Sequence, residues 1–157
     1  MMQVKKLYEL NPVRILYILI FCLVLSFLFY MYMGWPGKVN VADYENVESE
    51  SNIDNIRERH SSTGISGWFF VNDQESARQL KRKIILIGSG SAYSYPMQYL
   101  DRPDIADFYK NDKYKRSGFA LQINNRFIEK GRYKLYIAYI YDNKKYISDL
   151  KKEIQIP

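Results

Sequence analysis

The strongest pattern in the chain is an unbroken apolar run from Val13 to Met33, which reads VRILYILIFCLVLSFLFYMYM. The run contains one charge, Arg14, near its start. As an α-helix rising about 1.5 Å per residue, it is long enough to cross a hydrocarbon core of roughly 30 Å. A soluble amphipathic helix would show a polar face, and this run has none. The pattern therefore predicts a transmembrane helix over residues 13–33.

Two other interpretations of this run are less consistent with the sequence. A cleaved signal peptide has a shorter apolar stretch and small residues before its cleavage site, whereas MYMGWPG follows here. A buried helix of a soluble protein would need a larger surrounding domain than the rest of the chain supplies. We therefore expect a single-pass anchor in a lipid bilayer.

The charges on the two sides of the run predict its orientation. Lys5, Lys6 and Arg14 precede or open it, against only Glu9. Between the run and Arg57, acidic residues dominate. Lys38 is the one basic residue there, against Asp43, Glu45, Glu48, Glu50 and Asp54. The positive-inside rule then places residues 1–12 in the cytoplasm and everything beyond the span outside the plasma (inner) membrane. Trp35, Tyr30 and Tyr32 suit the outer aromatic belt.

Residues 34–62 are polar, and we expect them to form a tether with a candidate first strand at 39–47. From residue 63 to 157 the pattern changes to short β-branched or aromatic runs, separated by Gly, Pro, Asn, Asp and Ser. This spacing predicts an all-β sandwich or barrel, and the length of this region is that of an immunoglobulin-like sandwich. Only residues 102–114 look helical, with Pro103 in the first turn, and YDNKKY predicts a hairpin turn. The expected core residues are Ile65, Trp68, Phe70, Ile85, Ile87, Leu121, Ile123, Leu135 and Ile137.

The fold class predicted is therefore mainly β: an N-terminal transmembrane helix, then an immunoglobulin-like (Ig-like) antiparallel β-sandwich with one short helix. The domains expected are 1–12, 13–33, 34–62 and 63–157. The chain has one cysteine, Cys22, inside the span, so the outer domain cannot contain a disulfide.

Few residues are suited to catalysis. His60 is the only histidine, which argues against Ser-His, Cys-His and zinc sites. The stretch GSGS at 88–91 lacks the third glycine and the helix of a nucleotide loop. Asp101, Asp104 and Asp107 could hold Ca²⁺ or act as paired carboxylates, but helix-start carboxylates, with Arg102 paired structurally to one of them, explain them more simply. We expect no enzyme activity, no metal and no cofactor.

Charge and tyrosine content suggest a binding surface instead. The protein carries a net charge of +6 and 15 tyrosines. The candidate basic patch comprises Lys81, Arg82, Lys83, Lys113, Lys115 and Arg116. Outside a cell such a field suits an anionic polysaccharide or lipid headgroups, and no nucleic acid is expected; solvated lysines that protect strand edges are the simpler alternative. The candidate exposed aromatic side chains for sugar stacking are Tyr93, Tyr95, Tyr99 and Tyr136, with core or rim packing as the alternative.

Two resemblances point to a known type of module. Gly131 and Tyr133, with Glu129 before them, are similar to the tyrosine corner of immunoglobulin sandwiches, with Leu135 where antibodies carry a cysteine. A wider pattern also resembles the Ig-like accessory modules appended to bacterial cell-surface glycan glycosyltransferases and methyltransferases. It comprises Gly67-Trp68, Arg102-Pro103-Asp104-Ile105-Ala106, Ser117-Gly118-Phe119 and Gly131-x-Tyr133.

The resemblance implies structural roles for Trp68, Arg102, Asp104, Phe119, Gly131 and Tyr133. It implies a membrane-anchored, non-catalytic binding or accessory module in cell-envelope or surface-glycan assembly. The alternatives are a structural subunit that contacts another membrane protein and, with less support, a carboxylate-based enzyme.

Overall fold

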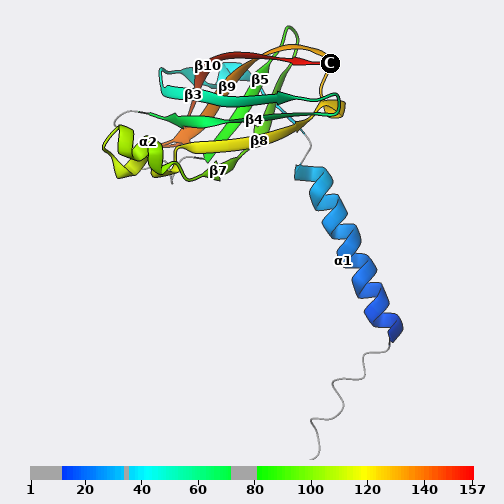
Figure 1. Ribbon diagram of the computed structural model, residues 1–157. Helices are drawn as coiled ribbons and strands as arrows, with labels where there is room; N and C mark the ends of the chain where they lie inside the picture. Colours follow the sequence, from blue (N-terminus) through cyan, green and yellow to red (C-terminus); the bar gives the residue numbers. More distant parts are fainter. Residues whose placement is uncertain (1–11, 34–35, 72–80) are drawn as a thin grey trace, which may run out of the picture. The chain divides into compact units, whose positions relative to one another are not determined.

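The computed structural model describes residues 12–33, 36–71 and 81–157. The chain divides into two compact units, Met1–Gly34 and Trp35–Pro157. In the first unit a single helix, α1 (Pro12–Met33), is long and apolar enough to cross a membrane (Figure 1). It coincides with the predicted helix 13–33 and begins one residue earlier. Trp35, expected in the aromatic belt, lies outside the described residues.

The second unit consists of two β-sheets (Figure 1). The four-stranded sheet has the order β3-β4-β8-β7 and the six-stranded sheet the order β1-β6-β5-β9-β10-β2. The strands are β1 (Gly37–Lys38), β2 (Glu45–Asn46), β3 (Glu50–Glu58), β4 (Ser62–Phe70), β5 (Lys81–Ile87), β6 (Ala92–Pro96), β7 (Gln98–Leu100), β8 (Gly118–Asn124), β9 (Gly131–Tyr141) and β10 (Lys144–Ile156). All neighbours pair antiparallel except β2, which is parallel to β10.

This strand order is that of an immunoglobulin sandwich. The four-stranded sheet corresponds to strands A, B, E and D of that fold, and β6-β5-β9-β10 corresponds to C′, C, F and G. The predicted corner is present, because the Tyr133 hydroxyl donates a hydrogen bond to the Glu129 carbonyl at 2.9 Å. Gly131 has φ +152°, a backbone conformation that favours glycine. The predicted fold class is confirmed.

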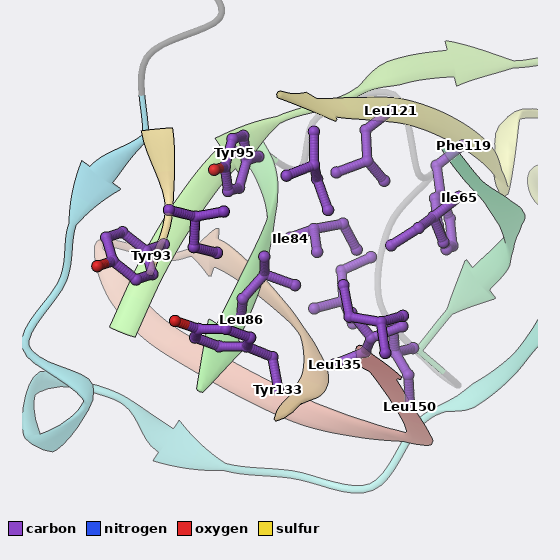
Figure 2. Close-up of a cluster of buried hydrophobic side chains, with 14 of the residues drawn as sticks. Ile65, Ile84, Leu86, Tyr93, Tyr95, Phe119, Leu121, Tyr133, Leu135 and Leu150 are labelled. Carbon is purple, nitrogen blue, oxygen red and sulfur yellow. The ribbon is translucent and has the colours of Figure 1, made fainter. Parts of the chain in front are cut away.

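The core lies between the sheets, and alternate residues of β4, β5, β6, β8 and β9 point into it (Figure 2). Ile65, Leu121, Ile123, Leu135 and Ile137 belong to it, as expected. Phe70 and Ile85 are buried as expected, but with Trp68 and Ile87 they lie on the outer faces of their sheets and not between the sheets. The inward residues of β4 and β5 have the opposite parity and are Thr63, Ile65, Gly67, Phe69, Arg82, Ile84 and Leu86.

The segment expected to be a tether is also corrected by the structure. Its described residues, 36–62, belong to the second unit and supply β1, β2, β3 and the start of β4. Val39, Val41 and Tyr44 pack on a second hydrophobic cluster, formed by Ile85, Ala138 and Ile147. This cluster occupies the outer face of the six-stranded sheet, so residues 39–44 cover part of that face. The candidate strand at 39–47 is realised only as β2, preceded by a 3₁₀ turn, η1 (Val41–Asp43).

Among the described residues of the second unit, the one α-helix is short and lies in the predicted segment. Helix α2 (Pro103–Phe108) and the 3₁₀ turn η2 (Asp112–Arg116) lie within residues 102–114 or just beyond, and η3 (Asn125–Phe127) follows β8. Both residues of the β9–β10 turn, Asp142 and Asn143, have positive φ, as a tight hairpin requires. Helix α2 and η2 lie beside the last residues of β4, because the Phe69 amide donates to the Ser117 carbonyl. We call this end of the sandwich the α2 end.

Candidate binding surface

Two of the four candidate sugar-stacking tyrosines are buried. Tyr93 and Tyr95 lie on the inner face of β6 and are 5 % and 2 % exposed (Figure 2). The expectation that they are exposed is therefore wrong. It failed because SAYSYP is a strand paired with β5 and not an open loop. Burial raises the pKa of Tyr95 well above its ordinary value.

Tyr99 is the candidate that remains accessible, at 48 % exposure. It lies on β7, just after the chain crosses from the six-stranded sheet to the four-stranded one. Tyr99 reaches back to β5 of the six-stranded sheet, where the backbone amide of Arg82 donates a hydrogen bond to the Tyr99 hydroxyl at 3.2 Å. Pro96 ends β6 opposite Lys83, so Tyr99 supplies an acceptor to β5 where the β6 ladder stops.

The prediction that Arg82 belongs to the exposed basic patch is wrong. Its side chain is buried, and the residue is only 4 % exposed. Its guanidinium lies 4.7 Å from the centre of the Tyr99 ring and donates to the carbonyls of Phe69 and Arg116. Burial lowers the pKa of Arg82, and the interaction with Tyr99 opposes this shift. Arg82 therefore ties β5 to the end of β4 and to η2, and it holds the Tyr99 ring in place.

The other candidate cations are exposed. Lys81 and Lys83 flank Arg82 on β5 with the opposite parity, so they lie on the outer face of the six-stranded sheet, while Arg116 ends η2 at the carbonyl that Arg82 binds. Asp101 partly neutralises Arg116, at 3.5 Å from its Nε. We call the exposed set the basic edge. It consists of Lys81, Lys83, Lys113, Lys115 and Arg116 beside Tyr99.

Arg102 forms the predicted structural pair with an aspartate, and the partner is Asp104. The guanidinium of Arg102 donates to both Asp104 oxygens, from Nε at 2.9 Å and from Nη2 at 2.7 Å. It also pairs with Asp54 on β3. Asp54 is the extra residue of a β-bulge, since Ile53 faces Gly67 and Asn55 faces Ser66. The hydrogen bonds from Arg102 lower the pKa of Asp104.

An aromatic cluster on the outer face of the four-stranded sheet was not foreseen. Phe70 stacks on Tyr114 with ring centres 3.8 Å apart, and Trp68 stacks on Phe70. Tyr109 packs edge-on against Phe70, and burial raises the pKa of its phenol. Phe108 is 77 % exposed at the rim of this cluster. The two tyrosines in the predicted helical segment, Tyr109 and Tyr114, were the sequence feature that could have indicated this cluster.

Tyr136, the fourth candidate, is half-buried on the outer face of the six-stranded sheet, where it packs on the cluster of Ile85, Ala138 and Ile147. His60 lies in the exposed turn between β3 and β4, and its carbonyl accepts from Asn125. Within residues 12–33, 36–71 and 81–157, His, Cys, Asp and Glu form no group of three placed to hold a metal ion.

Comparison with protein-family models, curated proteins and solved structures finds no match to this chain. The candidate surface is therefore described by its own chemistry. It combines one exposed aromatic ring, fixed at its hydroxyl and on one face, with several exposed cations.

Proposed function

We propose that the protein is a membrane-anchored, non-catalytic Ig-like module that binds a cell-envelope glycan during its assembly or attachment. The observation that carries the proposal is the α2 end of the sandwich, where Tyr99 and the basic edge are held on a rigid framework. Ig-like sandwiches cluster their connecting loops at the two ends, and rigid scaffolds that position loops are a common basis for recognition.

Two of the three candidate catalytic aspartates form ion pairs with arginine, which supports binding over catalysis. A carboxylate-based enzyme would need two acids facing a substrate position. Here Asp104 is paired with Arg102, and Asp101 with Arg116. The pair with Arg102 lowers the pKa of Asp104, whereas a catalytic acid near neutral pH needs a raised pKa. The sequence resemblance to glycan-associated accessory modules adds to this proposal.

The location proposed is the plasma (inner) membrane, with the N-terminus in the cytoplasm and the sandwich outside. The basic residues that precede α1 and the acidic ones that follow it support this orientation. Pro157→Cys in a Cys22→Ser background should react with a membrane-impermeant maleimide added to intact cells. Labelling only after lysis would contradict the orientation.

The binding proposal is tested with the full chain in nanodiscs of uncharged lipid, on a panel of neutral and acidic envelope polysaccharides. At least one polymer should bind the loaded nanodiscs and not the empty ones. No binding above empty nanodiscs across the panel would refute the proposed function.

A further inference from the structure

The rigid placement of Tyr99 beside the basic edge indicates a particular ligand chemistry. The ring is fixed by the Arg82 amide at its hydroxyl and by the Arg82 guanidinium on one face. Tyr99 is nevertheless 48 % exposed, so a large part of the side chain is accessible. An aromatic face carries partial negative charge and attracts polarised C–H groups, which the flat side of a pyranose ring presents.

The charges in these two segments are unbalanced. Residues 81–83 and 112–116 carry six cationic side chains and one acidic side chain, Asp112. Among the described residues, Asp101 also pairs with Arg116. Lys81 and Lys83 are exposed on β5, and Lys113, Lys115 and Arg116 are exposed on η2. Such a field attracts anions and raises their local concentration. Arginine also pairs with carboxylates in a bidentate geometry.

We propose that Tyr99 and the basic edge form a binding surface for a uronic-acid-containing polysaccharide, with one sugar ring stacked on Tyr99 and neighbouring carboxylates paired with the cations. This inference rests on the proposed function, which it makes more specific by naming the ligand class and the surface. A polymer suits the surface because it repeats both groups along its length.

An anionic membrane surface would also attract the cations, but Tyr99 does not suit it. Insertion into the headgroup region requires aromatic side chains that project from the surface. Tyr99 instead presents a fixed ring face, because its hydroxyl end is bonded back to β5. The observations therefore favour a flat sugar ring over a lipid.

The test uses the full chain in nanodiscs of uncharged lipid and measures Kd for polygalacturonate. Two further probes separate the contributions: methyl-esterified polygalacturonate keeps the sugar rings without the charge, and inorganic polyphosphate keeps the charge without sugar rings. We expect the order polygalacturonate, polyphosphate, ester, from tightest to weakest. We also expect polygalacturonate binding to weaken as salt rises, since exposed charge interactions are screened.

Variants locate the surface. Lys81→Gln with Lys83→Gln should weaken polygalacturonate binding about tenfold, since exposed charge pairs contribute up to about fivefold each. The double variant Lys113→Gln with Lys115→Gln should act in the same direction. The matched control is Lys130→Gln with Lys134→Gln, which removes the same charge. Lys134 faces Ile87 on β5, six residues beyond Lys81 and about 20 Å along the strand.

Tyr99 separates stacking from charge. Tyr99→Leu should weaken polygalacturonate binding about fivefold, in the range of aromatic contacts, and leave polyphosphate binding unchanged. Tyr99→Phe keeps the ring, so it should bind polygalacturonate like the unaltered chain even where loss of the bond to Arg82 lowers its thermal stability. Melting temperatures of all variants show which of them are folded.

The outcomes distinguish this inference from the proposed function. Equal binding of polygalacturonate and its ester, equal loss in the control and basic-edge variants, or binding of phosphatidylglycerol vesicles in preference to polygalacturonate would each overturn the inference alone. Binding to some other envelope polymer without polygalacturonate would also overturn it while leaving the proposed function in place. No polysaccharide binding of any kind would overturn both.

Discussion

Gly67 is the position where a single methyl group should be most disruptive. A Cβ built on Gly67 would lie 2.2 Å from the Asn52 carbonyl oxygen and 3.1 Å from the Ile53 Cα. Both atoms belong to the backbone of β3, so no side-chain rotation can relieve the contact. For Gly67→Ala to fold, β3 must move away from β4 next to its bulge.

The expected loss can be worked from this geometry. Overpacking of well-packed sites typically costs 1–3 kcal/mol, and here the obstacle is backbone, so we expect a loss of about 3 kcal/mol. Gly64 lies on the same strand, and its Cβ would meet nothing within 4 Å. Gly64→Ala should therefore stabilise by about 0.5 kcal/mol, because alanine is more favourable than glycine within a strand.

Urea unfolding of the full chain in detergent, followed by near-ultraviolet circular dichroism, measures both changes. With a slope of about 1.5 kcal/mol per molar urea, Gly67→Ala should lower the midpoint by about 2 M and Gly64→Ala should raise it slightly. Equal midpoints for the two variants would show that β3 and β4 do not approach closely at Gly67.

Three further predictions concern hydroxyl and carboxyl groups. Tyr133→Phe removes the hydrogen bond to the Glu129 carbonyl and should lower the free energy of unfolding by about 1–1.5 kcal/mol; an unchanged value would contradict the tyrosine corner. Arg102 lowers the pKa of Asp104, so this pair stabilises the fold above the unfolded pKa of about 3.9, and the stabilisation is lost as pH falls through the folded pKa. Asp104→Asn should make stability less dependent on pH in that range, and an identical acid profile would contradict the pair. Burial raises the pKa of Tyr95, whose hydroxyl finds no hydrogen-bond partner among the described residues, so its contribution is complete below the unfolded pKa of about 10 and declines at higher pH. Tyr95→Phe should therefore keep its stability at pH 7 and delay alkaline unfolding, while a loss above about 1 kcal/mol at pH 7 would indicate a lost hydrogen bond.

The features predictable from the sequence were those with one dominant local cause. The apolar run could only be α1, and the alternation in β9 identified Leu135 and Ile137 as core residues because one face of that strand is buried in the main core. The tyrosine corner was predictable because all of its residues, from Glu129 to Tyr133, lie within five positions of the sequence.

β3 was missed because its bulge interrupts the alternation. Ile53 and Ile56 both pack on the core, although they are three residues apart. The extra residue, Asp54, shifts the parity between them. An edge strand with charged residues also looks polar in sequence, so residues 50–58 were assigned to a tether.

The wrong face was chosen for β5 because both of its faces are covered. Ile84 and Leu86 point into the main core, whereas Ile85 lies under residues 39–44. A strand buried on both sides reads as a continuous apolar run, which removes the period-two signal. Arg82 shares the parity of Ile84, and this was the one local indication that it points inward.

The location of the binding surface is tested most directly by amide hydrogen exchange on the full chain in nanodiscs, with and without saturating polygalacturonate. Binding at the basic edge predicts slower exchange in residues 81–83, 98–101 and 112–116, with no change in residues 124–134 at the opposite end. Slower exchange confined to residues 124–134, or no change anywhere in the sandwich, would contradict it.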